Sequence, residues 1–313
     1  MATIIKSGSY LPTNVWSNDA LIQKYQLASD KTWIEQRTGI QSRHFVNDSE
    51  NVVDLAQAAV ENLLEGLDQD IKDQIRLVIV ASMSSGLPTP SIACQIIVRL
   101  GFYQAWGFDL SGACAGFVMA MDVANNMIKS YDQGYSLVIG AESMSEILNM
   151  EDRGSAILFG DGAGAFLIKH DGQGLADYIA DFHQVHQGWD AILADKTSQY
   201  KLTMRGREVF NFVNRQVVPS LATFIQDHGL TPDLLLCHQA NRRLLDIFQQ
   251  KLGLNSQQIP SNIDQVANLS AASIPVLFDQ LVKNGTLNYQ NNHSLILCGF
   301  GAGLSWGHLH FSL

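Results

Sequence analysis

The chain has 313 residues, a length typical of two domains or two fused halves rather than one small module. Hydrophobic residues make up 46% and charged residues 16%, below the roughly 25% of an average soluble domain, so we expect a large core and an oligomer. The formal net charge of −10 argues against nucleic acid as a partner, because phosphate binding needs a dominant basic surface.

The N-terminal segment and the cysteines indicate the cellular compartment. The segment from Met1 to Gly8 lacks the basic and apolar regions of a signal peptide, and no stretch reads as a transmembrane span, so we expect no membrane partner. The cysteines are scattered and form no C-x-x-C pair, which indicates a reducing cytoplasm and predicts neither a disulfide framework nor a zinc site. They are Cys94, Cys114, Cys237 and Cys298.

Helical patterns alternate with short apolar runs through the first half. The runs are continuously apolar, as in strands of a sheet that is covered on both faces, so the order predicts an α/β fold. Thr89 is the expected cap of one helix, with Pro90 in its first turn. The strands are predicted over residues 77–81, 137–141 and 164–168. Three helices are predicted. The first has an apolar face of Val52, Leu55, Ala59 and Leu63, and the second follows Thr89-Pro90. The third begins near Ser111 and runs through Phe117, Met119, Ala120 and Val123.

The second half repeats this arrangement. A strand over 234–237 enters a helix, and a strand over 295–298 runs into Gly299-Phe-Gly-Ala-Gly303, much as the first half ends in Phe159-Gly-Asp-Gly-Ala-Gly164. We interpret this as a duplicated α/β unit, with an N-terminal half over 1–168 and a C-terminal half over 169–313.

Cys114 lies among small residues between a predicted strand and a long helix. The free N–H groups and the dipole of a helix N-terminus favour a thiolate, and Ala113 and Ala115 leave room for a bulky thioester. The Cys114 N–H could also face a developing oxyanion. On this evidence alone, a buried cysteine that serves only as a small hydrophobic residue remains the alternative.

His238 and Asn268 are two further candidates from the second half. His238 follows a buried strand, at the carboxyl end where α/β sheets open to ligands, although a lone histidine of this kind is usually structural. Asn268 precedes small residues and could simply cap a helix. Because an amide does not transfer protons at neutral pH, a catalytic Asn268 would donate a hydrogen bond to an oxyanion.

Taken together, these segments resemble the 3-oxoacyl-(acyl-carrier-protein) synthase III family. The motifs occur in family order across nearly the whole chain, which makes the resemblance specific. They are Ser7-Gly-Ser-Tyr-Leu-Pro12, Arg37-Thr-Gly-Ile40, Ala113-Cys-Ala-Gly116, Asp152-Arg-Gly154, Phe159-Gly-Asp-Gly-Ala-Gly164, His238-Gln-Ala-Asn241, Asn268-Leu-Ser-Ala-Ala-Ser273 and Gly299-Phe-Gly-Ala-Gly303.

The resemblance implies a thiolase-like fold, with two α/β halves in five α-β-α-β-α layers, and a homodimer. It implies that Cys114 takes the acyl group of acetyl-CoA or another short acyl-CoA. Malonyl-acyl carrier protein then loses carbon dioxide, and its enolate, held by His238 and Asn268, attacks the acyl group in a decarboxylative Claisen condensation that initiates fatty acid synthesis. It implies no cofactor, since the CoA thioester and the phosphopantetheine are substrates. Two fixed donors in a dry pocket suit an enolate, and cysteine is both nucleophile and leaving group.

The resemblance also assigns binding residues. Trp33 and Arg153 would flank the CoA adenine, with Arg37 near the phosphates, and Thr89 would line the acyl pocket of the partner subunit. An acidic carrier protein would need a local basic patch on this acidic chain. The candidates for this patch are Arg207, Arg243 and Lys251, together with Arg205, Arg215 and Arg242.

Four positions depart from the family pattern. Cys237 stands where proline is more usual, and Ala302 stands at the middle glycine of a loop whose N–H would complete the oxyanion hole. Asn211 and Gln250 stand where basic docking residues often occur. These changes affect loop geometry and carrier-protein affinity rather than the chemistry.

Three alternatives remain open from the sequence. A Cys–His–Asn set also serves thiol hydrolases, although the contexts of His238 and Asn268 speak against one. A closer alternative is a sister thiolase-fold enzyme of secondary metabolism that joins other acyl units. A scaffold without activity is disfavoured because Cys114, His238 and Asn268 are all present.

Overall fold

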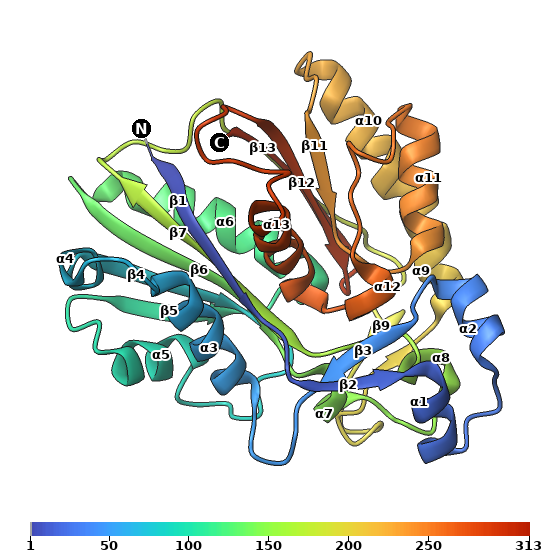
Figure 1. Cartoon of the computed structure of the whole chain (residues 1–313). Coiled ribbons are helices and arrows are strands. Elements are labelled where there is room, and N and C mark those ends of the chain that lie inside the picture. The colour runs from blue at the N-terminus through green and yellow to red at the C-terminus, as the bar shows by residue number, and fades with distance from the viewer. Residues whose placement is uncertain (1) are drawn as a thin grey trace.

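The computed structural model describes residues 2–313, which form two large β-sheets with helices on both faces of each (Figure 1) and two small two-stranded sheets. The first sheet has five strands in the order β1-β7-β6-β4-β5. β1 pairs antiparallel with β7 and β7 antiparallel with β6, whereas β6, β4 and β5 run parallel. These strands are β1 (Thr3–Tyr10), β4 (Ile75–Ala81), β5 (Trp106–Leu110), β6 (Gly134–Glu142) and β7 (Gly162–His170).

The second sheet repeats four of these positions with the same directions. Its order is β11-β12-β13-β8, in which β11 and β12 are parallel and the other pairs antiparallel. β8 therefore corresponds to β1, β13 to β7, β12 to β6 and β11 to β4. The strands are β8 (Ile179–Gln184), β11 (Leu234–Cys237), β12 (Ser294–Gly301) and β13 (Ser305–Ser312).

The helices complete five layers, which confirms the expected α-β-α-β-α arrangement. α3 and α5 cover the outer face of the first sheet, α6 and α13 lie between the sheets, and α10 and α11 cover the outer face of the second (Figure 1). The bounds are α3 (Val52–Leu64), α5 (Ile92–Leu100), α6 (Gly116–Met127), α10 (Val218–Asp227), α11 (Arg242–Leu252) and α13 (Ser273–Lys283).

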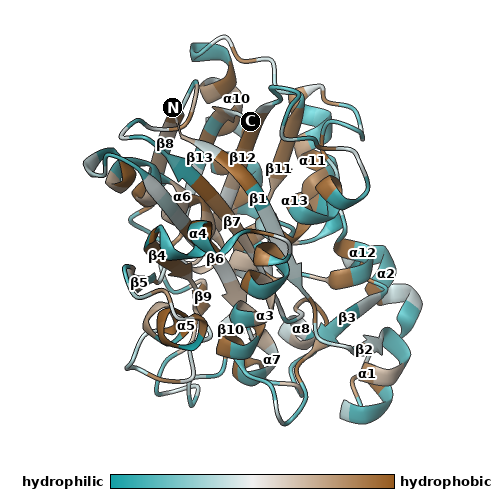
Figure 2. Ribbon diagram, turned by 60° about the vertical axis from the view of Figure 1, so that its left-hand side comes forward, coloured by the Kyte–Doolittle hydropathy of each residue, from teal (hydrophilic) through white to brown (hydrophobic). Residues whose placement is uncertain are grey.

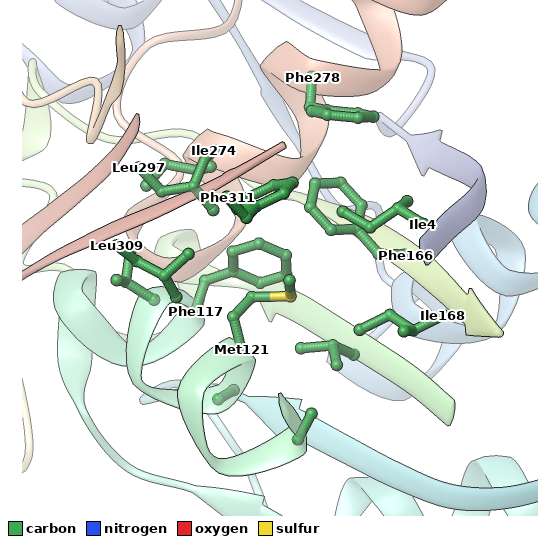
Figure 3. Packing of buried hydrophobic residues seen from close by; sticks show 14 of the residues in the cluster. Ile4, Phe117, Met121, Phe166, Ile168, Ile274, Phe278, Leu297, Leu309 and Phe311 are labelled. Atoms are coloured by element: carbon green, nitrogen blue, oxygen red, sulfur yellow. The ribbon is translucent and has the colours of Figure 1, made fainter. Parts of the chain in front are cut away.

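The middle layer carries the largest apolar cluster. Phe117 of α6, Phe166 of β7 and Phe278 of α13 are fully buried there, with ring centroids 5.1 Å apart for the first pair and 4.4 Å for the second (Figure 3). Leu297 and Phe311 bring the second sheet into the same cluster. Because both sheets share this apolar layer, the halves pack as one body.

Hydropathy follows the same layers. β11 and β12 are almost wholly apolar, while α2 is mostly hydrophilic (Figure 2). A strand that is apolar on both faces needs cover on both faces, and α6, α13, α10 and α11 supply it. None of the helices in residues 2–313 is long and apolar enough to cross a membrane.

Smaller elements gather at one end of the sheets (Figure 1), and α2, α7, α8, β9, β10 and α9 among them line a cavity. Arg43 of β3 is fully buried there and donates to Asn18 Oδ1 at 2.8 Å and to the Ile157 carbonyl at 3.1 Å. It thereby ties the antiparallel β2–β3 pair to the start of α1 and to the segment after α8. The elements are β2 (Asn14–Ser17), α1 (Asn18–Tyr25), α2 (Lys31–Thr38), β3 (Ser42–Phe45), α7 (Met144–Ile147), α8 (Arg153–Ala156), β9 (Ile192–Leu193), β10 (Thr203–Met204), α9 (Gly206–Phe212) and α12 (Ile263–Val266).

Two predicted helix starts are wrong in detail. α5 is capped by Ser91, whose hydroxyl accepts from the Cys94 N–H, and by Asp109, which accepts from Ile92 and Ala93, so Thr89 lies outside the helix. The helix expected from near Ser111 starts at Gly116, after a 3-10 turn η1 (Ala113–Ala115). The predicted strands are confirmed. β7 continues to His170, and the division at 168/169 stays a prediction.

Candidate active site

A single cavity of about 800 Å³ contains most of the predicted site residues. It runs from the surface at α2, α8 and α11 down to η1. Cys114, His238 and Asn268, which the sequence separates widely, all line it. The remaining predicted residues along its wall are Trp33, Arg37, Arg153, Arg207, Arg243 and Ala302.

Cys114 lies in the 3-10 turn that joins β5 to α6, at the inner end of this cavity. Its thiol is buried and donates to Ser270 Oγ over 3.5 Å. The β12 backbone presses against it: a Cβ on Gly301 would meet the Cys114 nitrogen at 2.9 Å. This close approach requires glycine and places the β12–β13 turn beside Cys114.

The resting thiol is protonated, contrary to the thiolate expected at a helix N-terminus. Burial raises the pKa of Cys114 to about 12, and the nearby Glu142 carboxylate adds to the increase. The hydrogen bond between Cys114 and Ser270 and the local N–H lower this pKa, but their effect is smaller than that of burial. Desolvation therefore outweighs the helix terminus, and the thiol has to lose its proton when it reacts.

His238 directly follows β11 and lies nearly fully buried. Its main-chain N–H donates to the Cys298 carbonyl, and its ring packs edge-on against Phe300, with centroids 5.1 Å apart. Burial lowers the pKa of His238 to about 3, although the Ser270 carbonyl opposes this shift. The imidazole is therefore neutral around pH 7 and able to donate one N–H without carrying charge.

Asn268 is fixed by backbone and side-chain hydrogen bonds. Its main chain bonds to Leu158 and Gly160, which belong to the loop before β7. Its Oδ1 accepts from the Ser270 N–H at 2.8 Å. Because only the oxygen of the amide can accept from an N–H, this bond determines the orientation of the group and leaves Nδ2 as a donor. Leu269 and Ala272 are the N-cap residues of the two helices that follow, so the capping interpretation of Asn268 is wrong, and its nitrogen is available to a ligand.

The turn between β12 and β13 accommodates Ala302. Left-handed backbone falls on the neighbouring Gly303, with φ of 122°, whereas Ala302 has a negative φ that any residue adopts. Its methyl group is therefore compatible with the loop, and Ala302 lines the cavity beside Cys114.

Three non-glycine residues with positive φ surround the site. They are Ala113 (45°), Ala267 (62°) and Ser270 (48°), each next to or one step beyond a predicted catalytic residue. Left-handed backbone is costly for residues with a Cβ and persists where the surroundings fix it. The fold thus keeps Cys114 and Asn268 in strained segments.

The cavity mouth carries the predicted CoA residues. The Arg153 guanidinium lies 4.6 Å from the Trp33 ring centroid and that of Arg37 5.8 Å from it. Arg153 also donates to the Ala28 carbonyl at 2.8 Å. An aromatic ring with flanking guanidinium groups is suited to a flat, electron-rich ring and to phosphates.

The predicted docking cations separate into paired and unpaired groups. Arg205 bonds to Asp190 and Glu208, and Arg242 to Asp246. Within residues 2–313, no ion pair involves Arg207, Arg215, Arg243 or Lys251. Arg207 and Arg243 line the mouth, and Arg243 stacks 5.1 Å above Phe210.

Lys251 and Thr89 do not line the cavity. Lys251 lies exposed on α11 and donates to the Asn214 carbonyl. Thr89 is exposed in the loop before α5. In the part of the chain that the structure describes, no cluster of His, Cys, Asp and Glu side chains could hold a metal ion.

Sequence reasoning missed Glu142 and a role for Ser270. Glu142 ends β6, is fully buried, and accepts from Ser270 Oγ at 2.9 Å, so it lies directly behind Cys114. Burial raises the pKa of Glu142 to about 7. A carboxylate at the end of an apolar strand was a signal that could have identified it, because ligands bind at that end of such sheets.

This fold and this cavity define a thiolase-like condensing enzyme, in which a buried cysteine faces a histidine and an asparagine from the second half. Two family models match: 3-oxoacyl-[acyl-carrier-protein] synthase III over residues 108–188 and its C-terminal model over 226–313. The chain belongs to the 3-oxoacyl-[acyl-carrier-protein] synthase III family, and it is an acyltransferase.

Full-length relatives support this assignment. The beta-ketoacyl-[acyl-carrier-protein] synthase III of Streptococcus mutans is 36% identical, over 98% of both chains, and that of Streptococcus agalactiae is 37% identical. The synthase III from Aquifex aeolicus has a TM-score of 0.92 at 30% identity, over the whole of both chains. The priming beta-ketosynthase of the R1128 polyketide pathway has a TM-score of 0.90 at 31% identity, over 100% of this chain and 96% of its own.

Proposed function

We propose that this enzyme condenses a short acyl-CoA, with acetyl-CoA the first candidate, with malonyl-acyl carrier protein and so starts fatty acid synthesis. The observation that carries the proposal is that Cys114, His238 and Asn268 line one buried cavity, with the Asn268 amide turned so that its N–H is free. Acyl transfer and decarboxylation both need these groups around one substrate carbonyl.

In the first half-reaction, Cys114 attacks the acyl-CoA carbonyl and CoA leaves. The tetrahedral oxyanion accepts hydrogen bonds from the main-chain N–H groups of Cys114 and Ala302. These residues belong to η1 and to the β12–β13 turn, which lie close together because Gly301 has no side chain. A thioester then replaces a thioester, so the acyl group stays activated for the next step.

In the second half-reaction, malonyl-carrier protein enters and loses carbon dioxide. The electron pair moves onto the thioester oxygen, where the neutral His238 and Asn268 donate hydrogen bonds. The enolate carbon then attacks the acyl carbonyl, and Cys114 leaves as a thiolate. Neutral donors in a desolvated pocket stabilise the enolate without having to give up a proton.

We propose that Trp33 and Arg153 hold the CoA adenine and that Arg37 binds its phosphates. Replacing Arg153 with alanine should raise KM for acyl-CoA about tenfold and leave kcat unchanged, because a stacking contact outside the reacting centre contributes uniform binding. Steady-state kinetics measure this. Arg205→Ala is the matched control, since Arg205 is exposed and ion-paired but does not line the cavity. An unchanged KM in Arg153→Ala, or an equal rise in Arg205→Ala, would contradict the assignment.

We propose that the carrier protein docks at the cavity mouth. Arg207 and Arg243 are the best candidates because they are unpaired and lie at the entrance through which phosphopantetheine must pass. Lys251 lies farther along α11 and would extend the patch. Local positive charge steers an acidic partner even when the whole chain is acidic.

We propose a homodimer formed along β5, the edge strand of the first sheet. Large apolar side chains are exposed on α5, on β5 and in the loops around them, and an unpaired apolar edge is normally covered. Thr89 lies in this region, and in such a dimer it would line the acyl pocket of the partner subunit. The exposed side chains are Leu87, Val98, Tyr103 and Trp106.

We propose a cytoplasmic enzyme that needs no cofactor. Neither half-reaction is a net oxidation or reduction, so the chemistry needs no redox group. All four cysteines are free in the structure, including the neighbouring Cys237 and Cys298, as suits a reducing compartment.

The test is an assay with purified enzyme, a panel of acyl-CoAs and malonyl-carrier protein, with products identified by mass spectrometry. A two-carbon-extended 3-oxoacyl-carrier protein made from acetyl-CoA is the expected product. Products from longer acyl units or from a different carrier would favour the sister enzyme, to which the R1128 ketosynthase is the related example. Steady release of free acid without malonyl substrate would favour the hydrolase.

A further inference from the structure

Behind Cys114, a hydrogen-bonded chain leads away from the substrate cavity. The thiol donates to Ser270 Oγ at 3.5 Å, and Ser270 Oγ donates to Glu142 Oε1 at 2.9 Å. A hydroxyl has one proton to donate and can accept another, so Ser270 can serve both partners at once. The three groups come from η1, from the end of β6 and from η4 (Ser270–Ala272), a short turn that follows Asn268.

Glu142 has surroundings that suit an ionised carboxylate although it is fully buried. Its other hydrogen-bond partners all lie in residues 82–84, after β4, and at Ala271, and each of them is a donor. Among residues 2–313, no lysine or arginine bonds to this carboxylate. The carboxylate is thus held by dipoles alone, which stabilise a charge less completely than a cation does, and it remains able to take up a proton.

Charge conservation links this carboxylate to the thiol. Glu142 raises the pKa of Cys114, since two anions side by side in a buried site repel each other. If the proton that leaves the sulfur passes to Glu142, the buried network holds one negative charge before and after the transfer. If the proton leaves by any other route, the network holds two.

We propose that Glu142, acting through Ser270, accepts the proton of Cys114 during acylation and returns it when the product leaves. This inference rests on the proposed function and assigns a positioning role to two residues behind the nucleophile. His238 is then free to remain a neutral hydrogen-bond donor throughout the cycle.

The steps balance. On acylation, the Cys114 proton moves to Ser270 Oγ as the Ser270 proton moves to Glu142. The sulfur forms a bond to the acyl carbon, the bond from that carbon to the CoA sulfur breaks, and the CoA thiolate is protonated by solvent. After decarboxylation and carbon–carbon bond formation, the bond from carbon to Cys114 breaks, and the thiolate recovers its proton from Glu142 through Ser270. One proton is taken from solvent in each cycle.

The titratable groups around this chain favour Glu142 over His238 as the acceptor. The Cys114 thiol faces Glu142 through Ser270, and the His238 imidazole lies against the Ser270 carbonyl. Burial lowers the pKa of His238 to about 3, which makes it a weak base, whereas burial raises that of Glu142 to about 7. Of the two groups, Glu142 is therefore the stronger base.

The test measures Cys114 reactivity against pH in Glu142→Gln and Ser270→Ala. A Cys94→Ser background removes the exposed cysteine. Alkylation by iodoacetamide and single-turnover acetylation by acetyl-CoA are both followed by intact mass. In the Cys94→Ser background with Glu142 and Ser270 intact, both rates should rise through about pH 7. Above this pH Glu142 has lost its own proton and is able to accept the proton of Cys114. In both variants the rates near pH 7 should fall about a hundredfold and rise only at strongly alkaline pH.

Two control variants separate the relay from a structural role. Ser273→Ala removes a buried hydroxyl that bonds to the Leu269 N–H, on the same segment but without a bond to Cys114 or Glu142. Asp161→Asn converts another buried carboxylate, bonded to Ser145 and Val46. Both should keep the unmodified pH profile. Glu142→Gln or Ser270→Ala with that same profile would overturn the relay. Because iodoacetamide does not require the acyl site, normal alkylation without any acetylation would instead refute the proposed function.

Discussion

Replacing Cys114 with serine is expected to abolish acylation. Incubation with acetyl-CoA should add one acetyl group to the unmodified enzyme and none to Cys114→Ser, with the rate of acyl transfer lowered on the order of a thousandfold or more. The reason is chemical, because a serine hydroxyl ionises far less readily than a thiol and is a poorer leaving group in the following step. Burial, which already raises the pKa of the Cys114 thiol to about 12, would penalise an alkoxide still more.

Intact mass spectrometry followed by peptide mapping measures this result. Cys94→Ser is the matched control, because Cys94 is exposed and does not line the cavity. That variant should accept one acetyl group as the unmodified enzyme does. An acetyl adduct on Cys114→Ser at the normal rate, or its loss in Cys94→Ser, would show that the nucleophile has been assigned wrongly.

The second large effect is a separation of the two half-reactions. His238→Ala and Asn268→Ala should still accept the acetyl group on Cys114 but should decarboxylate malonyl-carrier protein about 10² to 10³ times more slowly. Each variant removes one donor from the enolate oxygen, which is present only in the second half-reaction. Acylation is read by intact mass, and decarboxylation by carbon dioxide release from the same samples.

Asn268→Asp tests the second prediction more specifically than Asn268→Ala, because it removes the N–H donor and keeps the acceptor oxygen. Aspartate keeps an oxygen that can accept from the Ser270 N–H, so the turn is preserved, but it offers no N–H and adds a negative charge beside the enolate. It should therefore lose decarboxylation at least as completely as Asn268→Ala. Asn262→Ala, which removes a bond to Gln280 outside the cavity, is the control and should retain the activity. Loss of acylation with decarboxylation retained would reverse the assignment.

The pH dependence of decarboxylation follows from the state of His238. Because burial lowers its pKa to about 3, the imidazole is already neutral over the whole range in which the enzyme is assayed. The decarboxylation rate of pre-acylated enzyme should therefore show no inflection near the ordinary histidine pKa of about 6.5. An inflection there that disappears in His238→Ala would mean that the imidazolium takes part.

The fold class and the candidate catalytic residues could be predicted from the sequence. Apolar runs such as 77–81 and 137–141 predict buried strands because local composition reflects two-sided burial, and β4 and β6 confirm them. The predicted cap at Thr89 is wrong because the first N–H groups of α5 bond to the side chains of Ser91 and Asp109. Asp109 lies after the helix in the chain, so a local sequence pattern does not reveal its contact.

By itself, the sequence determined the family and the fold class, and it selected Cys114, His238 and Asn268 as the candidate catalytic residues, since these depend on residue type and motif order. Only the tertiary structure decided the protonation of the thiol, the orientation of the Asn268 amide and the support from Glu142. These properties arise from burial and from contacts between segments far apart in the chain, 156 residues for Cys114 with Ser270 and 128 for Ser270 with Glu142. Desolvation and hydrogen bonding act over a few ångströms in space, and residue order does not specify those distances.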